Sequence, residues 1–210
     1  GQLVQQSTKN LMSIQGLYDR HINTRISSNK IKQLTKEEIY RHIDDPNVCL
    51  TIESNLRVLN CIQKQIKIIE KSLSKQTKLR YEFINLLTID GIGLILGLTI
   101  MLETGDISRF AKVGQYASYA RCVNGARYSN GKKKSKTNTK NGNKYLAWAF
   151  VEAANYAIRF NGTIKKYYQR KLAKSHVMVA KGAVAHKLAR ACYYILRDGV
   201  EFDVNKAFGS

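Results

Sequence analysis

The chain has 210 residues, 44% of them hydrophobic and 24% charged, which excludes a chain disordered throughout and allows one or two domains. Its formal net charge is +20, and residues 107–210 alone hold 21 basic and 4 acidic residues, a net charge of +17. Because this half of the chain is almost entirely positive in its charges, it predicts a polyanionic partner, either nucleic acid or an anionic membrane. Nucleic acid is favoured, because the longest apolar stretch, residues 92–102, is too short to span a bilayer.

The first 45 residues predict short helices joined by capped turns. Apolar residues recur at helical spacing in residues 3–18. The sequence of residues 35–38, Thr-Lys-Glu-Glu, has the form of a capping box and predicts a short helix that ends near His42. Asp45 can then cap the next helix, with Pro46 at its first position.

The next helix is long and runs from about Pro46 to about Lys78. Its apolar residues step by three and four positions, as in an a/d heptad seam. At ~1.5 Å per residue this helix is roughly 50 Å long. It is either a helix packed inside one domain or a coiled-coil arm that joins protomers; the narrow seam favours the arm and a homo-oligomer. The seam consists of Leu59, Ile62, Ile66, Ile69 and Leu73.

Residues 80–103 predict two helices joined by a tight glycine turn, Ile-Asp-Gly-Ile-Gly. This pattern is typical of a helix-hairpin-helix. Gly91 and Gly93 would let the backbone approach a phosphate, and the free amides that begin the second helix would attract it. A plain glycine turn between core helices is an equally good interpretation of these residues.

Residues 124–143 lack apolar periodicity and hold no acidic residue. Asn130-Gly131 and Asn141-Gly142 indicate turns, so we expect a basic hairpin loop. Its clustered cations repel one another unless a polyanion neutralises them, which favours nucleic-acid contact over a solvated loop. We predict that this contact is made by Arg127, Lys132, Lys133, Lys134, Lys136, Lys140 and Lys144.

Three helices are predicted after the loop. The first, residues 144–160, is capped by Asn143 and buries Leu146, Ala149, Phe150, Ala153, Ala154 and Ala157; the others lie near residues 163–174 and 180–197. The predicted fold is therefore mainly α: a long coiled-coil-like helix, then a compact helical domain with a helix-hairpin-helix and a basic hairpin loop.

The remaining residues indicate no metal site. The carboxylates are helix-capping or isolated, and neither the four histidines nor the four cysteines show metal-ligand spacing. We expect the cysteines to be reduced and buried. From residue chemistry alone, Ser129 is an ordinary loop serine, since no general base is identifiable beside it.

Two long segments resemble one family. The run from Leu86 to Phe110, the motif Arg127-Tyr-Ser-Asn-Gly-Lys-Lys-Lys and the run Lys140-Asn-Gly-Asn-Lys-Tyr-Leu are similar to the transposase domain of DEDD-type insertion-sequence transposases, the "one-ten" group. The downstream runs Trp148–Ala154 and Ala185–Cys192 fit the same group.

The resemblance implies a division of the chain. Residues 1–45 would be the tail of an N-terminal RuvC-like domain with linker helices, residues 46–79 the coiled coil, and residues 80–210 the transposase domain. That domain would hold the helix-hairpin-helix at 80–103, the serine loop at 124–143 and the C-terminal helices at 144–198. The rest of the RuvC-like domain, with four acidic ligands for Mg²⁺, would lie upstream of Gly1.

The resemblance also implies a function. Ser129 would be the nucleophile of a DNA transposase or recombinase that uses a structured guide RNA, with no cofactor held by this chain. The fragment alone would be inactive, and a cytoplasmic, nucleoid-associated bacterial protein is expected. The alternative is a non-catalytic basic helical module that only binds nucleic acid.

Overall fold

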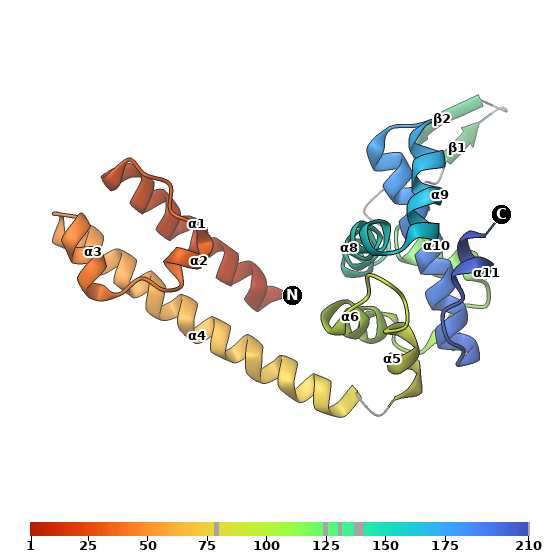
Figure 1. The fold of residues 1–210 in the computed structure, drawn as a ribbon, viewed down its shortest axis with the longest axis horizontal. Coiled ribbons are helices and arrows are strands. Elements are labelled where there is room, and N and C mark those ends of the chain that lie inside the picture. Colours follow the sequence, from red (N-terminus) through yellow and green to blue (C-terminus); the bar gives the residue numbers. More distant parts are fainter. Residues whose placement is uncertain (78–79, 124–125, 130–131, 137–140, 210) are drawn as a thin grey trace. The chain divides into compact units, whose positions relative to one another are not determined.

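The computed structural model of the chain describes residues 1–77, 80–123, 126–129, 132–136 and 141–209. The fold is mainly α-helical, which confirms the predicted fold class (Figure 1). The chain divides into two compact units, Gly1–Leu73 and Ser74–Ser210. Within the described ranges, no helix is both long enough and apolar enough to cross a membrane.

The first unit contains helices α1 (Gln2–Ile22), α2 (Ser28–Ile31), α3 (Lys36–His42) and most of α4 (Pro46–Thr77). The predicted capping box begins α3: the Glu38 amide donates to Thr35 Oγ1, and the Thr35 amide donates to Glu38 Oε2. Asp45 Oδ1 accepts the amide of Asn47 at 2.8 Å, as expected for the cap of α4. These local signals therefore set the predicted helix starts.

One hydrophobic core joins the four helices of the first unit. Residues from the predicted linker segment and from the long helix share it, and the first part of α4 supplies Cys49, Ile52, Leu56 and Leu59. Further along α4, Ile69 is 47% exposed. The upstream part of the helix is therefore packed inside this unit, while downstream apolar residues remain on its surface. The core consists of Ile14, Tyr18, Ile26, Ile31, Ile39, Ile43, Cys49, Ile52, Leu56 and Leu59.

The second unit is built from short elements before a basic hairpin and longer helices after it. In chain order these are α5 (Tyr81–Leu86), α6 (Leu94–Thr104), the 3₁₀ turn η1 (Ile107–Arg109), α7 (Val113–Tyr119), β1 (Ala126–Ser129), β2 (Lys132–Lys136), α8 (Lys144–Phe160), α9 (Gly162–Leu172), α10 (Val177–Asp198) and α11 (Val204–Phe208).

The core of the second unit lies where α8 packs on α6 and α10. All six residues predicted to be buried on α8 are buried, and its four alanines on that face let the neighbouring helices approach closely. Tyr116 is fully buried, and its hydroxyl lies 2.9 Å from Thr104 Oγ1. The hydroxyl of Tyr193 donates to the carbonyl of Phe110 at 3.0 Å. The two buried hydroxyls thus have the partners that burial requires.

Some boundaries differ from the sequence prediction. α10 begins at Val177 instead of Ala180, because Nδ1 of His176 accepts the amide of Met178 and extends the start by most of a turn. η1 and α7 had no predicted counterpart, since each is too short for a periodic apolar pattern. Of the cysteines, Cys49 and Cys192 are buried as expected, whereas Cys61 is exposed.

Candidate nucleic-acid and catalytic site

The basic loop contains an antiparallel pair of strands. β1 carries Arg127 and Ser129, and Ser129 pairs with Lys132 at the end where the two strands meet. The register shifts between Arg127 and Tyr128, which marks a bulge in β1. The sequence had suggested a hairpin but had assigned no strands.

The structure describes the backbone of some of the predicted contact residues and leaves the others undescribed. The backbones of Lys132, Lys133, Lys134 and Lys136 lie in β2. The side chains of β1 and β2, the predicted turn at 130–131 and Lys140 lie outside the described residues. The backbone thus places Ser129 next to the lysine-rich strand.

The two ends of the loop are held together at its base. Arg121 has a φ of 55° and donates from Nε and Nη2 to the carbonyl of Gly142, at 3.2 and 2.9 Å. The Asn143 amide donates to the carbonyl of Tyr119 at 2.7 Å. Gly142 has a φ of 92°, and a Cβ there would lie 2.4 Å from the same carbonyl, so only glycine fits. The segment from Cys122 to Asn141 therefore begins and ends at one anchored point.

Asn143 connects three elements at this base. Its Oδ1 accepts the amides of Tyr145 and Leu146, which caps α8 as predicted. Its Nδ2 donates to Glu103 Oε2 at 2.7 Å and to Tyr119 Oη at 3.4 Å. Glu103, an isolated carboxylate in the sequence, thus joins the end of α6 to the start of α8. Forty residues separate Glu103 from Asn143, so no local pattern could have indicated this contact.

The hydrogen bonds at this base and the nearby positive charge also lower the pKa of Tyr119. The hydrogen bond from Asn143 lowers the pKa of Tyr119, and the hydrogen bond from Arg109 lowers it further. The Arg109 guanidinium lies 4.6 Å from the centroid of the Tyr119 ring. Arg109 therefore brings a cation to the root of the hairpin that sequence analysis had not singled out.

The predicted helical hairpin consists of α5, a turn and α6. Gly91 has a φ of 98°, and a Cβ on it would lie 2.6 Å from the amide nitrogen of Ala157 and 2.7 Å from the carbonyl oxygen of Ala153. Gly91 is therefore required where the turn meets α8, and its contact with phosphate stays a prediction. Gly93 is different: it is exposed at the start of α6, with open space around its Cα.

A hydrogen bond ties this turn to the α8–α9 junction. Asn161 Nδ2 donates to Asp90 Oδ2 at 2.7 Å, while Asn161 Oδ1 caps α9 by accepting the amides of Thr163 and Ile164. The turn between α5 and α6 is thus held on two sides, by Gly91 against α8 and by Asp90 against Asn161. Such a turn presents the start of α6 in a defined place.

Lys144, the last residue of the predicted basic set, is exposed at the first position of α8, with Nζ 5.0 Å from the Tyr145 ring centroid. A second acid-free stretch lies between Glu152 and Asp198, with ten basic residues that the sequence analysis did not assign to a site. In the part of the chain that the structure describes, no three His, Cys, Asp or Glu side chains converge as a metal site requires.

Residues 84–169 match the model of the Transposase IS116/IS110/IS902 family. The matched segment runs from α5 into α9 and contains the β1–β2 hairpin, its anchored base and the α5–α6 turn. No curated protein matches the chain. The family match supports a role in DNA transposition, with DNA as a partner.

Proposed function

We propose that the chain supplies the nucleophile of an insertion-sequence transposase and that Ser129 is this nucleophile. The observation that carries the proposal is the position of Ser129 in the backbone pairing, opposite Lys132 at the end of a lysine-rich hairpin. The hairpin lies inside the segment that matches a transposase family. Fixed cations around a phosphate stabilise the negative charge that develops as a hydroxyl attacks it.

In the proposed reaction, the Ser129 hydroxyl gives its proton to solvent water and its oxygen forms a bond to a DNA phosphorus. The bond from phosphorus to the leaving strand's oxygen breaks, and that oxygen takes up a proton. The resulting covalent protein–DNA ester keeps the energy of the phosphodiester, so the strand can be passed to a second site. Arg127, Lys132, Lys133 and Lys134 would hold the DNA backbone during this step.

The carboxylates of the described residues do not converge on a metal site. We propose that the Mg²⁺ site of the complete protein would lie in a RuvC-like domain. A guide RNA is a further proposed partner. The turn between α5 and α6 would contribute to DNA binding as a helix-hairpin-helix, through the open start of α6 at Gly93.

The proposal is tested by replacing Ser129 in the full-length parent protein. We expect Ser129→Ala to abolish the covalent protein–DNA adduct on a denaturing gel while DNA binding is retained, and Ser129→Cys to keep some adduct, since a thiolate is also a nucleophile. Ser135→Ala is the matched control, because it removes a hydroxyl from the other strand of the same hairpin. An adduct formed by Ser129→Ala would refute the assignment and favour a module that only binds nucleic acid.

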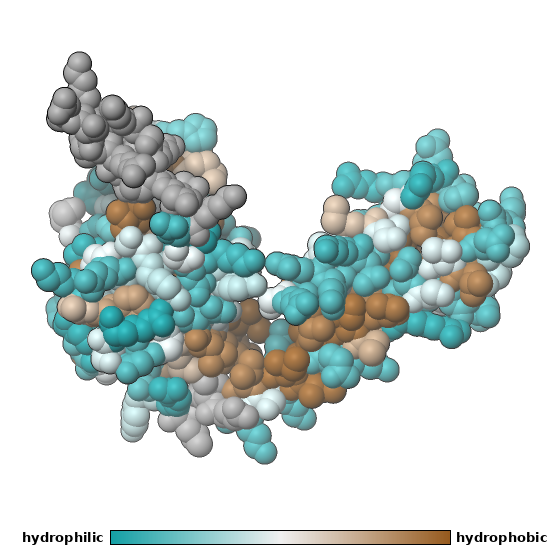
Figure 2. Space-filling view, turned by 180° about the vertical axis from the view of Figure 1, so that it is seen from behind, coloured by the Kyte–Doolittle hydropathy of each residue, from teal (hydrophilic) through white to brown (hydrophobic). Residues whose placement is uncertain are grey.

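We also propose that α4 joins two copies of the chain. Beyond the buried part of its seam, Ile69 is 47% exposed, and Ile62, Ile66 and Leu73 are partly exposed. Figure 2 shows hydrophobic residues gathered along this helix. Apolar side chains spaced by three and four positions on an exposed helix are typical of a coiled-coil interface, where a second helix covers them.

A further inference from the structure

A cavity of about 720 Å³ lies in the second unit, between α9, α10 and the C-terminal residues 200–207. Its volume falls in the range of sites that take one small molecule or one nucleotide, about 300–1,000 Å³. Most of its lining comes from α10 and α11, outside the segment that matches the family model. No residue that lines the cavity belongs to the serine hairpin or to the turn between α5 and α6, although the amide of the lining residue Phe202 donates to Thr88 Oγ1 of that turn at 3.0 Å.

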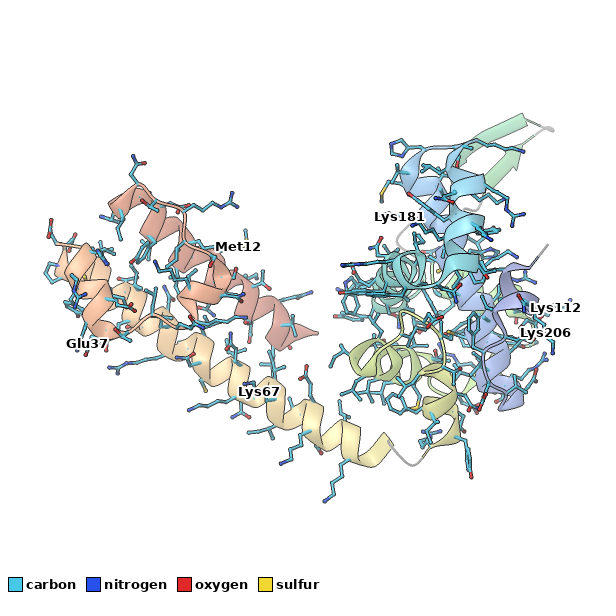
Figure 3. All side chains as sticks on the ribbon, viewed as in Figure 1. Met12, Glu37, Lys67, Lys112, Lys181 and Lys206 are labelled. Atoms are coloured by element: carbon cyan, nitrogen blue, oxygen red, sulfur yellow. The ribbon has the colours of Figure 1, made fainter. Side chains whose placement is uncertain are left out.

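Cations from two elements line this cavity. α10 contributes Lys187 and Arg190, and α11 contributes Lys206, which Figure 3 labels. Three acidic residues line it too, but two of them have partners in the protein. Asp198 accepts hydrogen bonds from Arg197 Nε at 2.6 Å and Nη2 at 2.9 Å. Asp203 caps α11 through the amides of Asn205 and Lys206. Asp203 keeps its charge as a cap and Glu201 is the third acid, so once Asp198 is paired with Arg197 the lining has three cations and two carboxylates, a surplus of one positive charge.

The cavity also has aromatic walls. Tyr167 of α9 is surrounded by cations, with Lys187 Nζ 5.1 Å and Lys171 Nζ 5.6 Å from its ring centroid. Lys187 is fixed in place, because its Nζ donates to the carbonyl of Ala207 at 2.7 Å. Tyr194 and Phe202 add further aromatic surface to the lining. Aromatic rings beside cations are the combination that binds unpaired nucleotides, since bases stack on rings and phosphates pair with cations.

Two lining residues have lowered pKa values, chiefly because they are partly buried and to a smaller extent because cations lie nearby. Burial lowers the pKa of His186, and the charges of Arg190 and Lys187 lower it further. Burial likewise lowers the pKa of Lys187, with additional effects from Arg190, Lys171 and Arg170.

We infer that this cavity binds one unpaired nucleotide of a nucleic-acid strand, with its phosphate on Arg190, Lys187 and Lys206 and its base against Tyr194 or Phe202. The inference rests on the proposed function in that the chain handles nucleic acid. A concave site of this size admits a single nucleotide but not a base-paired duplex. The strand is either DNA or RNA, which share the phosphate and the base.

The test compares two double variants of the full chain. Arg190→Gln with Lys206→Gln removes two exposed cations of the cavity. Lys174→Gln with Lys181→Gln removes one cation in the turn before α10 and one near the start of α10, and neither residue lines the cavity. Figure 3 labels Lys181 and the cavity residue Lys206. Fluorescence anisotropy would measure binding of a labelled single-stranded DNA tetramer, an RNA tetramer and a blunt DNA duplex.

We expect the cavity variant to bind a tetramer at least about tenfold more weakly than the wild type, with a salt slope shallower by about 0.7 for each lost phosphate contact. The tetramer that loses more identifies the strand as DNA or RNA. The cavity variant should bind the duplex as tightly as the control variant does. Equal tetramer affinity in the two variants would overturn the inference, and so would an equal loss of tetramer and duplex binding by the cavity variant.

The same binding measurements also distinguish a failure of this inference from a failure of the proposed function. If the wild type binds duplex but the cavity variant keeps full tetramer affinity, only the cavity inference fails. If the wild type binds neither duplex nor tetramer, the nucleic-acid function fails with it. The Ser129 adduct is measured independently of both results.

Discussion

The close packing of Gly91 on α8 leads to a prediction about stability. Gly91→Ala places a Cβ 2.6 Å from the Ala157 nitrogen and 2.7 Å from the Ala153 oxygen. Both atoms belong to the backbone of α8, so the clash cannot be relieved by turning a side chain. The backbone at Gly91, with a φ of 98°, is also one that alanine adopts at a cost.

The expected magnitude follows from two contributions. A left-handed backbone costs an L-residue roughly 1–2 kcal/mol. Forcing additional atoms into a packed interior costs about 1–3 kcal/mol. Together they lower the free energy of unfolding by about 2–5 kcal/mol. At roughly 4 °C per kcal/mol for a unit of this size, Tm falls by about 8–20 °C.

The assay is thermal unfolding followed by circular dichroism, with Gly93→Ala as the matched control. Gly93 lies two residues along the same turn, has a negative φ and has no atom within 4 Å of a built Cβ. Its replacement should change the free energy of unfolding by less than about 1 kcal/mol. If Gly91→Ala and Gly93→Ala unfold at the same temperature, the close approach of the turn to α8 is wrong.

Three further predictions concern other parts of the chain. Asn143→Ala removes the cap of α8 and the hydrogen bond to Glu103. It should lower the free energy of unfolding, measured by urea titration, by about 1–2 kcal/mol. A variant as stable as the wild type would contradict the role of Asn143 at the hairpin base. Replacing Ile66 and Ile69 with Lys should dissociate the proposed α4 assembly in light scattering, because the seam would bury charge; a wild-type chain that is monomeric at high concentration refutes the interface. The pKa of His186 is lowered from its usual value near 6.5 in the folded state, so the unfolded chain binds this proton more readily. The stability contributed by neutral His186 is therefore fully present above pH 6.5 and is lost as the pH falls below it. His186→Asn should make the urea midpoint depend less on pH between about pH 5 and 7. A variant whose urea midpoint depends on pH as that of the wild type does would refute the assignment to His186.

The sequence by itself determined the helices that carry local signals. The capping box at Thr35 and the cap at Asp45 begin helices where predicted, because a side chain that bonds an amide two or three residues ahead is a local device. The buried face of α8 was also predictable, since burial on one side of a helix repeats every three or four residues. The charge of the second half is likewise a property of composition alone.

Only the tertiary structure decided which distant residues meet. Gly91 lies against Ala153 and Ala157, Asn143 bonds Glu103, and Tyr167 lies beside Lys187. The physical reason is that contacts between elements depend on how helices pack, and neither periodicity nor capping specifies the neighbour of a helix. Isolated residues of the sequence thus become a fixed turn, an anchored hairpin base and a lined cavity once the helices of the second unit have packed together.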